Sequence, residues 1–300
     1  MKKIIYAYIV ILISVFAILS FLDINGEYPA EKAMWKINQQ FKTIIADPKA
    51  APPATYKQVT DEYKRFIERF PNSQLVPLAH LFLGRISMVR EDYKGAREKF
   101  ESIVNNYSKE NPVGLEALSE IVRSYTLEKD PVNILKTYHR IEQDYPLSGL
   151  GLHVPILIAK FHMDQKNTEQ AKVALASAID YYRKMINQYP KSLVEYNSLR
   201  LLATCYMAKK RWSDAVNTFG DLLIKYPDPR NTGNIVKAIN TVSIKNMGNF
   251  DLPISIYEKF IKTYPDHPFN EPLTEVIEKI KELKKQNVDE ATKNENESQK

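Results

Sequence analysis

Apolar and small residues recur at helical spacing along most of the chain, and the clearest stretch runs from Leu199 to Pro227. Its apolar positions are Leu202, Ala203 and Tyr206 on one predicted helix face and Ala215, Phe219 and Leu222 on the next. Small side chains let two antiparallel helices approach closely, and aromatic side chains fill the space toward the next pair. Tyr226-Pro227 ends the unit. The pattern therefore predicts a repeating pair of antiparallel helices.

The ends of successive units are marked by an aromatic residue, followed in five of six cases by proline. The closing positions are Pro71, Ser108, Pro146, Pro190, Pro227 and Pro265, and the spacings are 37, 38, 44, 37 and 38 residues. Proline stops a helix at such a place without breaking one. The longest spacing exceeds its neighbours by about two helical turns, so the second helix of that unit can lengthen without rotating its apolar face.

Three sets of equivalent positions support the same alignment. Second helices are predicted to begin at Asp92, Asp130, Asn167, Arg211 and Asn249, four of which are good helix N-caps. The positions predicted to fill the wedge between helices are Phe100, Tyr138, Leu175, Phe219 and Tyr257. The positions where first helices approach their neighbours are Gly84, Val122, Ala159, Ala203 and Thr241. All of these residues are expected to form core.

The ends of the array differ from its middle, as repeat arrays require. Helices over 30–46 and about 55–70 form an atypical first unit, in which Trp35 is expected to pack on the first repeat, with a place at a membrane interface as the alternative. A helix over about 271–287 caps the other end of the predicted array, which covers 30–287. Residues 288–300 lack an apolar face and are expected to be disordered.

The N-terminal sequence predicts a membrane segment. Ile4 to Leu22 are nineteen residues without a charge, thirteen of them Ile, Leu, Val or Phe, and this length nearly spans a bilayer. Lys2 and Lys3 place residues 1–3 in the cytoplasm and everything after Leu22 outside it. We expect an uncleaved single-pass anchor at 4–22 and a polar linker at 23–29. A secretory signal that is cleaved, releasing the chain to the periplasm, is the alternative.

Composition narrows the class of protein further. Hydrophobic residues make up 44% of the chain and only 9 of its 300 residues are glycine, which favours helices over a turn-rich β protein. The single cysteine, Cys205, falls in the apolar register and is expected to be a buried structural thiol. A net charge of +6, from 42 basic and 36 acidic residues, is too mild and dispersed for nucleic-acid binding to be expected.

No catalytic or cofactor motif is present in the sequence. The five histidines form no H-E-x-x-H pattern, and there is no G-x-S-x-G, no phosphate-binding glycine loop and no G-x-G-x-x-G. We therefore expect neither an enzyme nor a cofactor nor a metal site.

The phrases that close three units are similar to the YP-x-S signature of periplasmic tetratricopeptide proteins: Phe70-Pro71-Asn72-Ser73, Tyr145-Pro146-Leu147-Ser148 and Tyr189-Pro190-Lys191-Ser192. Over roughly 55–265 the chain resembles the repeat domains of the outer-membrane assembly factor BamD and of the Tol-Pal coordination protein. The resemblance implies an all-α, right-handed solenoid of helix pairs. BamD-like proteins are lipoproteins with a cysteine near residue 20, where this chain has Ser20-Phe21-Leu22.

The same resemblance implies a concave groove lined by first helices, with the residue after each close-approach position directed into it. These residues are Arg85, Arg123, Lys160, Thr204 and Val242. Arg200 lies one turn before Thr204 and Lys245 one turn after Val242, and Met88, Met163 and Met207 fall one turn after the same register. We hypothesise that the cations bind carboxylates of an extended acidic or C-terminal peptide and that the methionines pack its apolar side chains. The alternative is a solvated face on which cationic side chains cover apolar surface.

The function predicted from these features is a protein–protein interaction scaffold, anchored in the inner membrane, facing the periplasm and engaged in envelope or outer-membrane protein assembly. One alternative is a recruiting or regulatory subunit of a secretion or polysaccharide-export complex. The other is an adaptor for acidic polymers or cell-wall glycan, whose binding would weaken steeply with salt.

Overall fold

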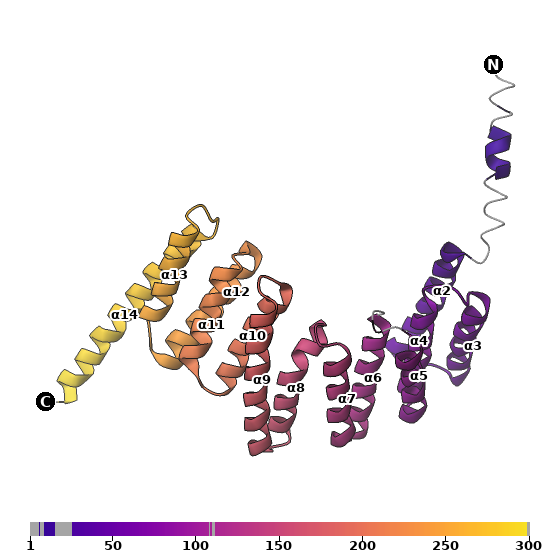
Figure 1. Ribbon diagram of the computed structural model, residues 1–300, viewed down its shortest axis with the longest axis horizontal. Helices are drawn as coiled ribbons and strands as arrows, with labels where there is room; N and C mark the ends of the chain where they lie inside the picture. The colour runs from indigo at the N-terminus through magenta and orange to yellow at the C-terminus, as the bar shows by residue number, and fades with distance from the viewer. Residues whose placement is uncertain (1–5, 7–8, 16–25, 108, 110–111, 299–300) are drawn as a thin grey trace. The chain divides into compact units, whose positions relative to one another are not determined.

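The computed structural model describes residues 6, 9–15, 26–107, 109 and 112–298, and side chains as far as residue 287 (Figure 1). Every regular element in that part of the chain is a helix. The chain divides into two compact units, Met1–Tyr145 and Pro146–Lys300. The predicted stub 1–3, the closing residue Ser108, most of the 4–22 segment and residues 23–25 of the linker lie outside the described residues.

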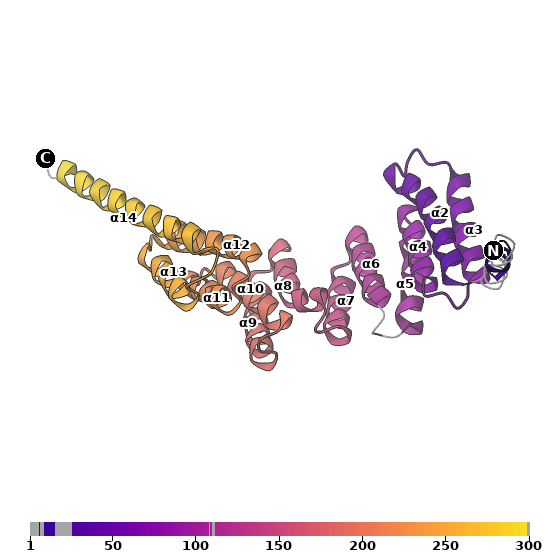
Figure 2. The same ribbon diagram turned by 90° about the horizontal axis from the view of Figure 1, so that it is seen from above.

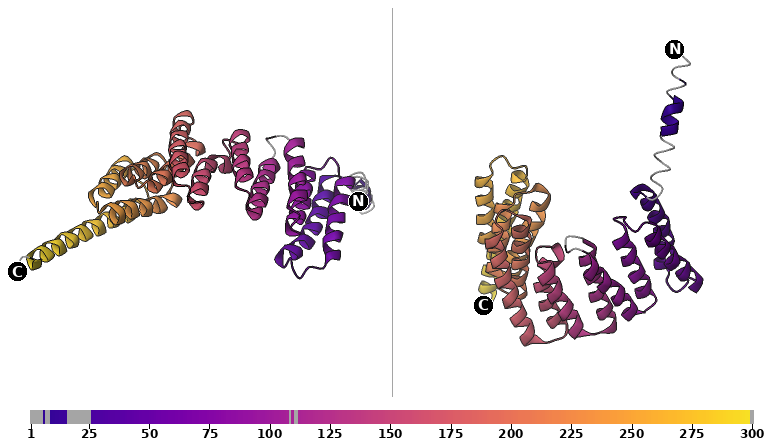
Figure 3. Two further views of the ribbon diagram at one scale, coloured as in Figure 1. Left: turned by 90° about the horizontal axis from the view of Figure 1, so that it is seen from below. Right: turned by 45° about the vertical axis from the view of Figure 1, so that its right-hand side comes forward.

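Unit 1 consists of three antiparallel helix pairs, each packed on the next (Figures 1 and 3). Its helices are α2 (Glu27–Ala46), α3 (Pro53–Arg69), α4 (Val76–Val89), α5 (Tyr93–Asn106), α6 (Pro112–Glu128) and α7 (Pro131–Asp144). The α4 and α5 backbones approach closely at Gly84, where an added Cβ would lie 2.3 Å from Cε1 of the fully buried Phe100. Gly84 and Phe100 thus hold the predicted close-approach and wedge positions.

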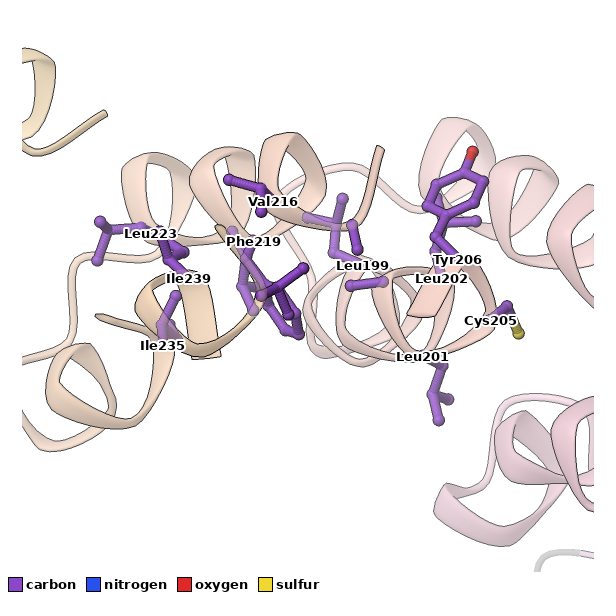
Figure 4. Close-up of a cluster of buried hydrophobic side chains, with 14 of the residues drawn as sticks. Leu199, Leu201, Leu202, Cys205, Tyr206, Val216, Phe219, Leu223, Ile235 and Ile239 are labelled. Carbon is purple, nitrogen blue, oxygen red and sulfur yellow. The ribbon is translucent and has the colours of Figure 1, made fainter. Parts of the chain in front are cut away.

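Unit 2 repeats the pairing and ends in a single long helix (Figure 2). Its elements are α8 (Gly149–Asp164), α9 (Thr168–Gln188), α10 (Leu193–Ala208), α11 (Trp212–Lys225), α12 (Pro229–Asn240), the π-helix η1 (Thr241–Asn246), α13 (Asp251–Thr263) and α14 (Asn270–Ser298). Leu199, Phe219 and Ile239, from three successive helices, meet in its core (Figure 4). Cys205 is buried there, and burial raises the pKa of its thiol to about 12.

Five helix pairs, two in unit 1 and three in unit 2, share one turn conformation between their helices, and the α2–α3 pair does not. The residue before the predicted cap has a positive φ in five pairs: Glu91 (62°), Lys129 (58°), Lys166 (58°), Lys210 (55°) and Gly248 (64°). In the first two of these pairs the next residue caps the second helix: the carboxylates of Asp92 and Asp130 accept the N–H groups of Gly95 and Asn133. Asn249 accepts from the N–H groups of Asp251 and Leu252 at the start of α13, whereas Asn167, a predicted cap, and Arg211 make no side-chain cap.

Two of the aromatic residues that close helix pairs in unit 2 hold helices together: Tyr226 bonds within its own pair, α10 and α11, and Tyr264 bonds to the preceding pair. The Tyr226 hydroxyl donates to the carbonyl of Ser192 at 3.1 Å, and the Tyr264 hydroxyl donates to the carbonyl of Ile224 at 2.5 Å. The longest predicted spacing is confirmed as a longer second helix, because α9 has 21 residues where α11 has 14. The predicted all-α array of antiparallel helix pairs is therefore confirmed, while its handedness stays a prediction.

The alignment of the last pair was wrong by one residue. The N–H of Asn249 bonds to the carbonyl of Ser243, six residues back, whereas Arg211 bonds to Tyr206, five residues back. The π-turn of η1 contains one extra residue, so the predicted helix positions that precede the turn are shifted by one residue. As a result Val242, predicted to point into the groove, is fully buried, and Thr241, predicted to be core, is exposed.

Both ends of the described chain differ from expectation. The first helix begins at Glu27 rather than residue 30, and Trp35 does not pack on the first repeat: 64% of it is exposed. At the other end, α14 continues through 288–298, which were expected to be disordered; this stretch contains neither glycine nor proline, the two residues that disfavour a helix most. Within the described residues no helix combines the length and apolar content needed to cross a bilayer.

Candidate functional site

Three first helices of unit 1 surround a cavity of about 510 Å³. These are α2, α4 and α6, which the repeat places next to one another because the second helices pack on the opposite side. The lining comprises Asn38, Phe41, Lys42 and Ile45 of α2, Pro48 of the turn between α2 and α3, Phe82, Arg85, Met88 and Val89 of α4, and Glu120, Arg123 and Leu127 of α6. We call this set the α2–α4–α6 groove.

The apolar part of the groove is built on aromatic contacts between α2, α3 and α4. The Phe41 and Phe82 rings meet edge to face with centroids 5.2 Å apart, and Phe82 stacks on Tyr63 of α3 at 5.5 Å. Met88 is buried beside them, whereas Ile45 and Leu127 remain about half exposed. A ligand side chain in the groove would contact the aromatic floor, which is formed by Phe41 and Phe82, and would displace water from Ile45 and Leu127.

The charged part of the groove is dominated by a salt-bridge network between α4 and α6. Arg85 bonds to Glu116 at 2.6 Å and to Glu120 at 2.7 Å, and Arg123 lies 3.5 Å from the other oxygen of Glu120. Burial alone would lower the pKa of Arg85, but hydrogen bonds and charge from Glu120 and Glu116 outweigh burial and raise it. Arg85 is therefore a fixed cation that ties α4 to α6.

Two other cations in the groove are better placed to meet a ligand. The Arg123 side chain is 67% exposed, and its one salt bridge among the described residues is the long contact to Glu120. Lys42 is exposed, and among the described residues it forms no salt bridge. With Glu120 nine-tenths buried beneath Arg85 and Arg123, the solvent-facing charge of the groove is positive.

The structure gathers three of the nine predicted site residues in one cavity: Arg85, Met88 and Arg123. The other six belong to unit 2, where Lys160 and Met163 are exposed on α8, Arg200 and Thr204 on α10 and Lys245 on η1, while Met207 packs partly buried against the core. The Thr204 hydroxyl donates to the carbonyl of Arg200, and Arg200 lies 3.5 Å from His153. A single row of ligand-binding cations through both units stays a prediction.

The residues that sequence reasoning missed come mainly from the atypical first unit. Phe41, Lys42 and Ile45 lie on α2, which has no counterpart in the groove alignment because that alignment began at Arg85. Glu116 and Glu120 are four residues apart on α6 and therefore share a face. That spacing was a visible signal, but the pairing with Arg85, more than thirty residues away, is a tertiary contact.

The repeated helix pairs define a helical-repeat protein, and the first helices of unit 1 line a cavity. The type of repeat follows from a comparison with known families: residues 198–229 match the family model described as a tetratricopeptide repeat. This match covers the stretch from Leu199 to Pro227 and shows that the chain carries at least one such repeat. No curated protein matches the sequence significantly.

Several solved structures are similar to this chain at low identity. A tetratricopeptide repeat protein from Parabacteroides merdae is 13% identical, with 85% of this chain and 98% of that chain covered and a TM-score of 0.40. Yeast Tom70 is 14% identical, with 83% and 47% covered and a TM-score of 0.44. The domain of yeast Sti1 in complex with pHSP90 is 11% identical, with 85% and 100% covered and a TM-score of 0.34. Scores this low carry nothing about function, and the resemblance to BamD and the Tol-Pal protein stays a prediction.

Proposed function

We propose that this protein is a non-enzymatic scaffold that binds a segment of a partner protein in the α2–α4–α6 groove. Tetratricopeptide repeats indicate a protein–protein interaction scaffold, which is the general part of the proposal. The observation that supports the site is the combination, in one cavity of about 510 Å³, of an aromatic floor with exposed cations. A cavity of that size accepts a few side chains of a peptide.

The chemistry of the groove favours a ligand with an apolar side chain next to a carboxylate. The apolar group would pack on Phe41, Phe82 and Met88, where it displaces water. The carboxylate would pair with Arg123 and Lys42, since both face solvent. Arg85 has a different role in this proposal from the one the sequence indicated: it positions α4 against α6 because two glutamates already occupy its guanidinium.

We also propose that the scaffold is anchored in the inner membrane through residues 4–22 and faces the periplasm, serving envelope or outer-membrane protein assembly. The support is the uncharged run of nineteen residues behind Lys2 and Lys3. Alkaline extraction of membranes tests the anchor. Recovery of a soluble chain with a new N-terminus after residue 22 would replace the anchor with a cleaved signal.

Charge reversal tests the groove. The double variant Lys42→Glu/Arg123→Glu is expected to lose capture of the native partner, because two attractive contacts become repulsive. The matched control is Lys57→Glu/Lys94→Glu, which changes the net charge equally at two exposed lysines of α3 and α5 that do not line the groove. Both variants should keep the wild-type helix content. Equal capture by wild-type protein and the groove variant would refute the site.

A salt titration and the variant Phe82→Ala separate peptide binding from the acidic-polymer alternative. Binding to a polymer through a row of cations should fall steeply as salt rises, because screening acts on every exposed contact. Binding that depends on the apolar floor should depend more weakly on salt and should be lost in Phe82→Ala, which removes the ring between Phe41 and Tyr63.

A further inference from the structure

The outward face of α2 carries two large aromatic side chains that the fold does not use. Tyr28 is 72% exposed and Trp35 is 64% exposed. They are seven residues apart and so lie on one side of the helix, two turns from each other. The opposite side of α2 is buried in the core of unit 1 through Ala30, Met34, Ile37, Phe41 and Ile44.

An exposed tryptophan two turns from an exposed tyrosine is unusual on a protein surface, because tryptophan is on average among the most buried residues. Neither ring is needed to hold α2, whose apolar stripe already faces α3 and α4. Tryptophan and tyrosine are enriched where a protein meets the interface of a membrane, because each ring has an apolar body and a polar group.

One flank of the two rings carries the charge that an anionic lipid surface attracts. Lys32 and Lys36 are exposed on that flank of α2. Glu31 is exposed on the opposite flank, and Glu27, the other carboxylate of α2, lies on that flank too and accepts a hydrogen bond from the Ser73 hydroxyl at 3.1 Å. Lysines close to a membrane surface contribute to binding through the negative potential of acidic headgroups.

The position of α2 in the chain supplies an independent argument. The helix begins at Glu27, five residues after Leu22, where the uncharged run ends. Five residues reach at most about 18 Å even when fully extended. If the run crosses the membrane, as the proposed function has it, the first turn of α2 cannot lie far from the bilayer surface.

We infer that the outward face of α2 docks on an anionic lipid surface, with Tyr28 and Trp35 at the level of the headgroups and Lys32 and Lys36 against their phosphates. This contact adds a second attachment to the membrane and fixes which side of unit 1 faces it. The docking of α2 rests on the proposed anchor at residues 4–22 and goes beyond it. The two can be tested separately, because the chain can be anchored without contact between α2 and lipid.

Tryptophan fluorescence of the full chain in vesicles tests the inference. The chain has two tryptophans, so Trp212→Phe leaves Trp35 as the single probe. The protein is reconstituted in vesicles of phosphatidylcholine and phosphatidylglycerol, and in vesicles of phosphatidylcholine alone, each with and without acyl chains brominated near the headgroup. Bromine quenches Trp35 when the ring lies in the interface, and aqueous iodide quenches it when the ring lies in water.

The expected result is quenching of Trp35 by brominated lipid in the phosphatidylglycerol vesicles, with little quenching by iodide. Lys32→Glu/Lys36→Glu should lower the ratio of docked to undocked α2 roughly tenfold or more. The control Val173→Glu, at a residue of α9 that is 66% exposed, should leave quenching unchanged. All three changed residues are exposed, so the variants should retain the wild-type circular dichroism spectrum.

Two results would overturn the inference. One is quenching of Trp35 by iodide, and not by brominated lipid, in both kinds of vesicle. This result would overturn the docking of α2 even if the chain resists alkaline extraction and the anchor is confirmed. The other is equal lipid quenching in the Lys32→Glu/Lys36→Glu variant, which would assign the contact to the tether alone. A chain that alkali extracts would refute the proposed anchor, and the quenching in the same vesicles would still decide the docking of α2.

Discussion

Gly84→Ala tests how closely α4 and α5 pack beneath the groove. The added Cβ would lie 2.3 Å from Cε1 of Phe100 and 2.8 Å from Cδ1 and Cζ. Phe100 is fully buried and has no free space to turn into. Ordinary carbon contacts begin near 3.4 Å, so the ring or the α4 backbone has to move by about 1 Å, which falls at the costly end of core overpacking.

The size of the effect follows from two opposing contributions. Overpacking costs about 3 kcal/mol at this end of its range. Replacing glycine by alanine inside a helix gains about 1 kcal/mol of helix propensity. We therefore expect Gly84→Ala to lower the free energy of unfolding by about 2 kcal/mol. Because α4 carries Phe82, Arg85 and Met88, its displacement should also weaken binding in the groove.

A double-mutant cycle with Phe100→Leu identifies the cause. The smaller side chain gives the new methyl group room, so the double variant should recover about 1 kcal/mol or more relative to the sum of the single changes. Urea unfolding followed by circular dichroism measures the total, and hydrogen exchange in α4 and α5 measures the local loss. The control is Gly149→Ala, whose Cβ would meet nothing within 4 Å. Additive single effects, or a stable Gly84→Ala protein, would refute the close approach.

Two further predictions concern the turns inside the helix pairs and the buried carboxylate of Glu195 in α10. Replacing Glu91, Lys129, Lys166 or Lys210 by glycine should stabilise the chain by about 0.5–1 kcal/mol each, because residues other than glycine are strained at positive φ. Urea unfolding measures the change, and the control Lys184→Gly, inside helix α9, should lower stability. A loss of stability from the turn substitutions would contradict the positive φ at these positions. Glu195→Gln should destabilise by about 1–3 kcal/mol at neutral pH, with the difference shrinking in acid; a difference that is constant from neutral to acid pH would show that the Glu195 charge is irrelevant.

The sign of the Glu195 effect follows from its surroundings. Burial raises the pKa of this carboxyl, but hydrogen bonds from Lys225 at 2.5 Å, Tyr226 at 2.7 Å and the Lys191 amide at 2.6 Å outweigh burial and lower it. A carboxyl whose pKa is lower in the folded state than in the unfolded chain contributes stability above the unfolded value of about 4.3. That contribution is lost as the pH falls through the lowered pKa.

Local sequence patterns were sufficient to predict how each unit is built. Aromatic closing residues, N-caps and small close-approach residues act within one repeat or between neighbours, so their spacing carries the information. The prediction failed at η1, because a π-helical turn holds more residues than an α-helical one. As a result Val242 is buried and Thr241 exposed, the reverse of the prediction. It failed also at Trp35, where amphipathic spacing identified the buried stripe correctly but assigned the tryptophan a packing role outside it.

The groove was less predictable than the fold. The repeat register placed Arg85, Met88 and Arg123 on one surface, as the structure has them. It did not show that Glu116 and Glu120 occupy Arg85, because an ion pair between two helices depends on side chains more than thirty residues apart. Some cations in such a row are paired with carboxylates of a neighbouring helix, so the number of cations in the sequence overstates the positive charge available to a ligand.

Site-specific photo-crosslinking from Leu127 tests the central claim most directly. Leu127 lines the groove and is half exposed, so a photoreactive residue there should be tolerated. In intact cells we predict one dominant crosslinked protein, with the crosslink mapped to a segment that combines an apolar residue with a carboxylate, and its loss in Lys42→Glu/Arg123→Glu. The same probe at Val132 of α7, which is 72% exposed and outside the groove, should not capture it. Equal capture from both positions, or capture that survives the charge reversal, would contradict the groove as the binding site.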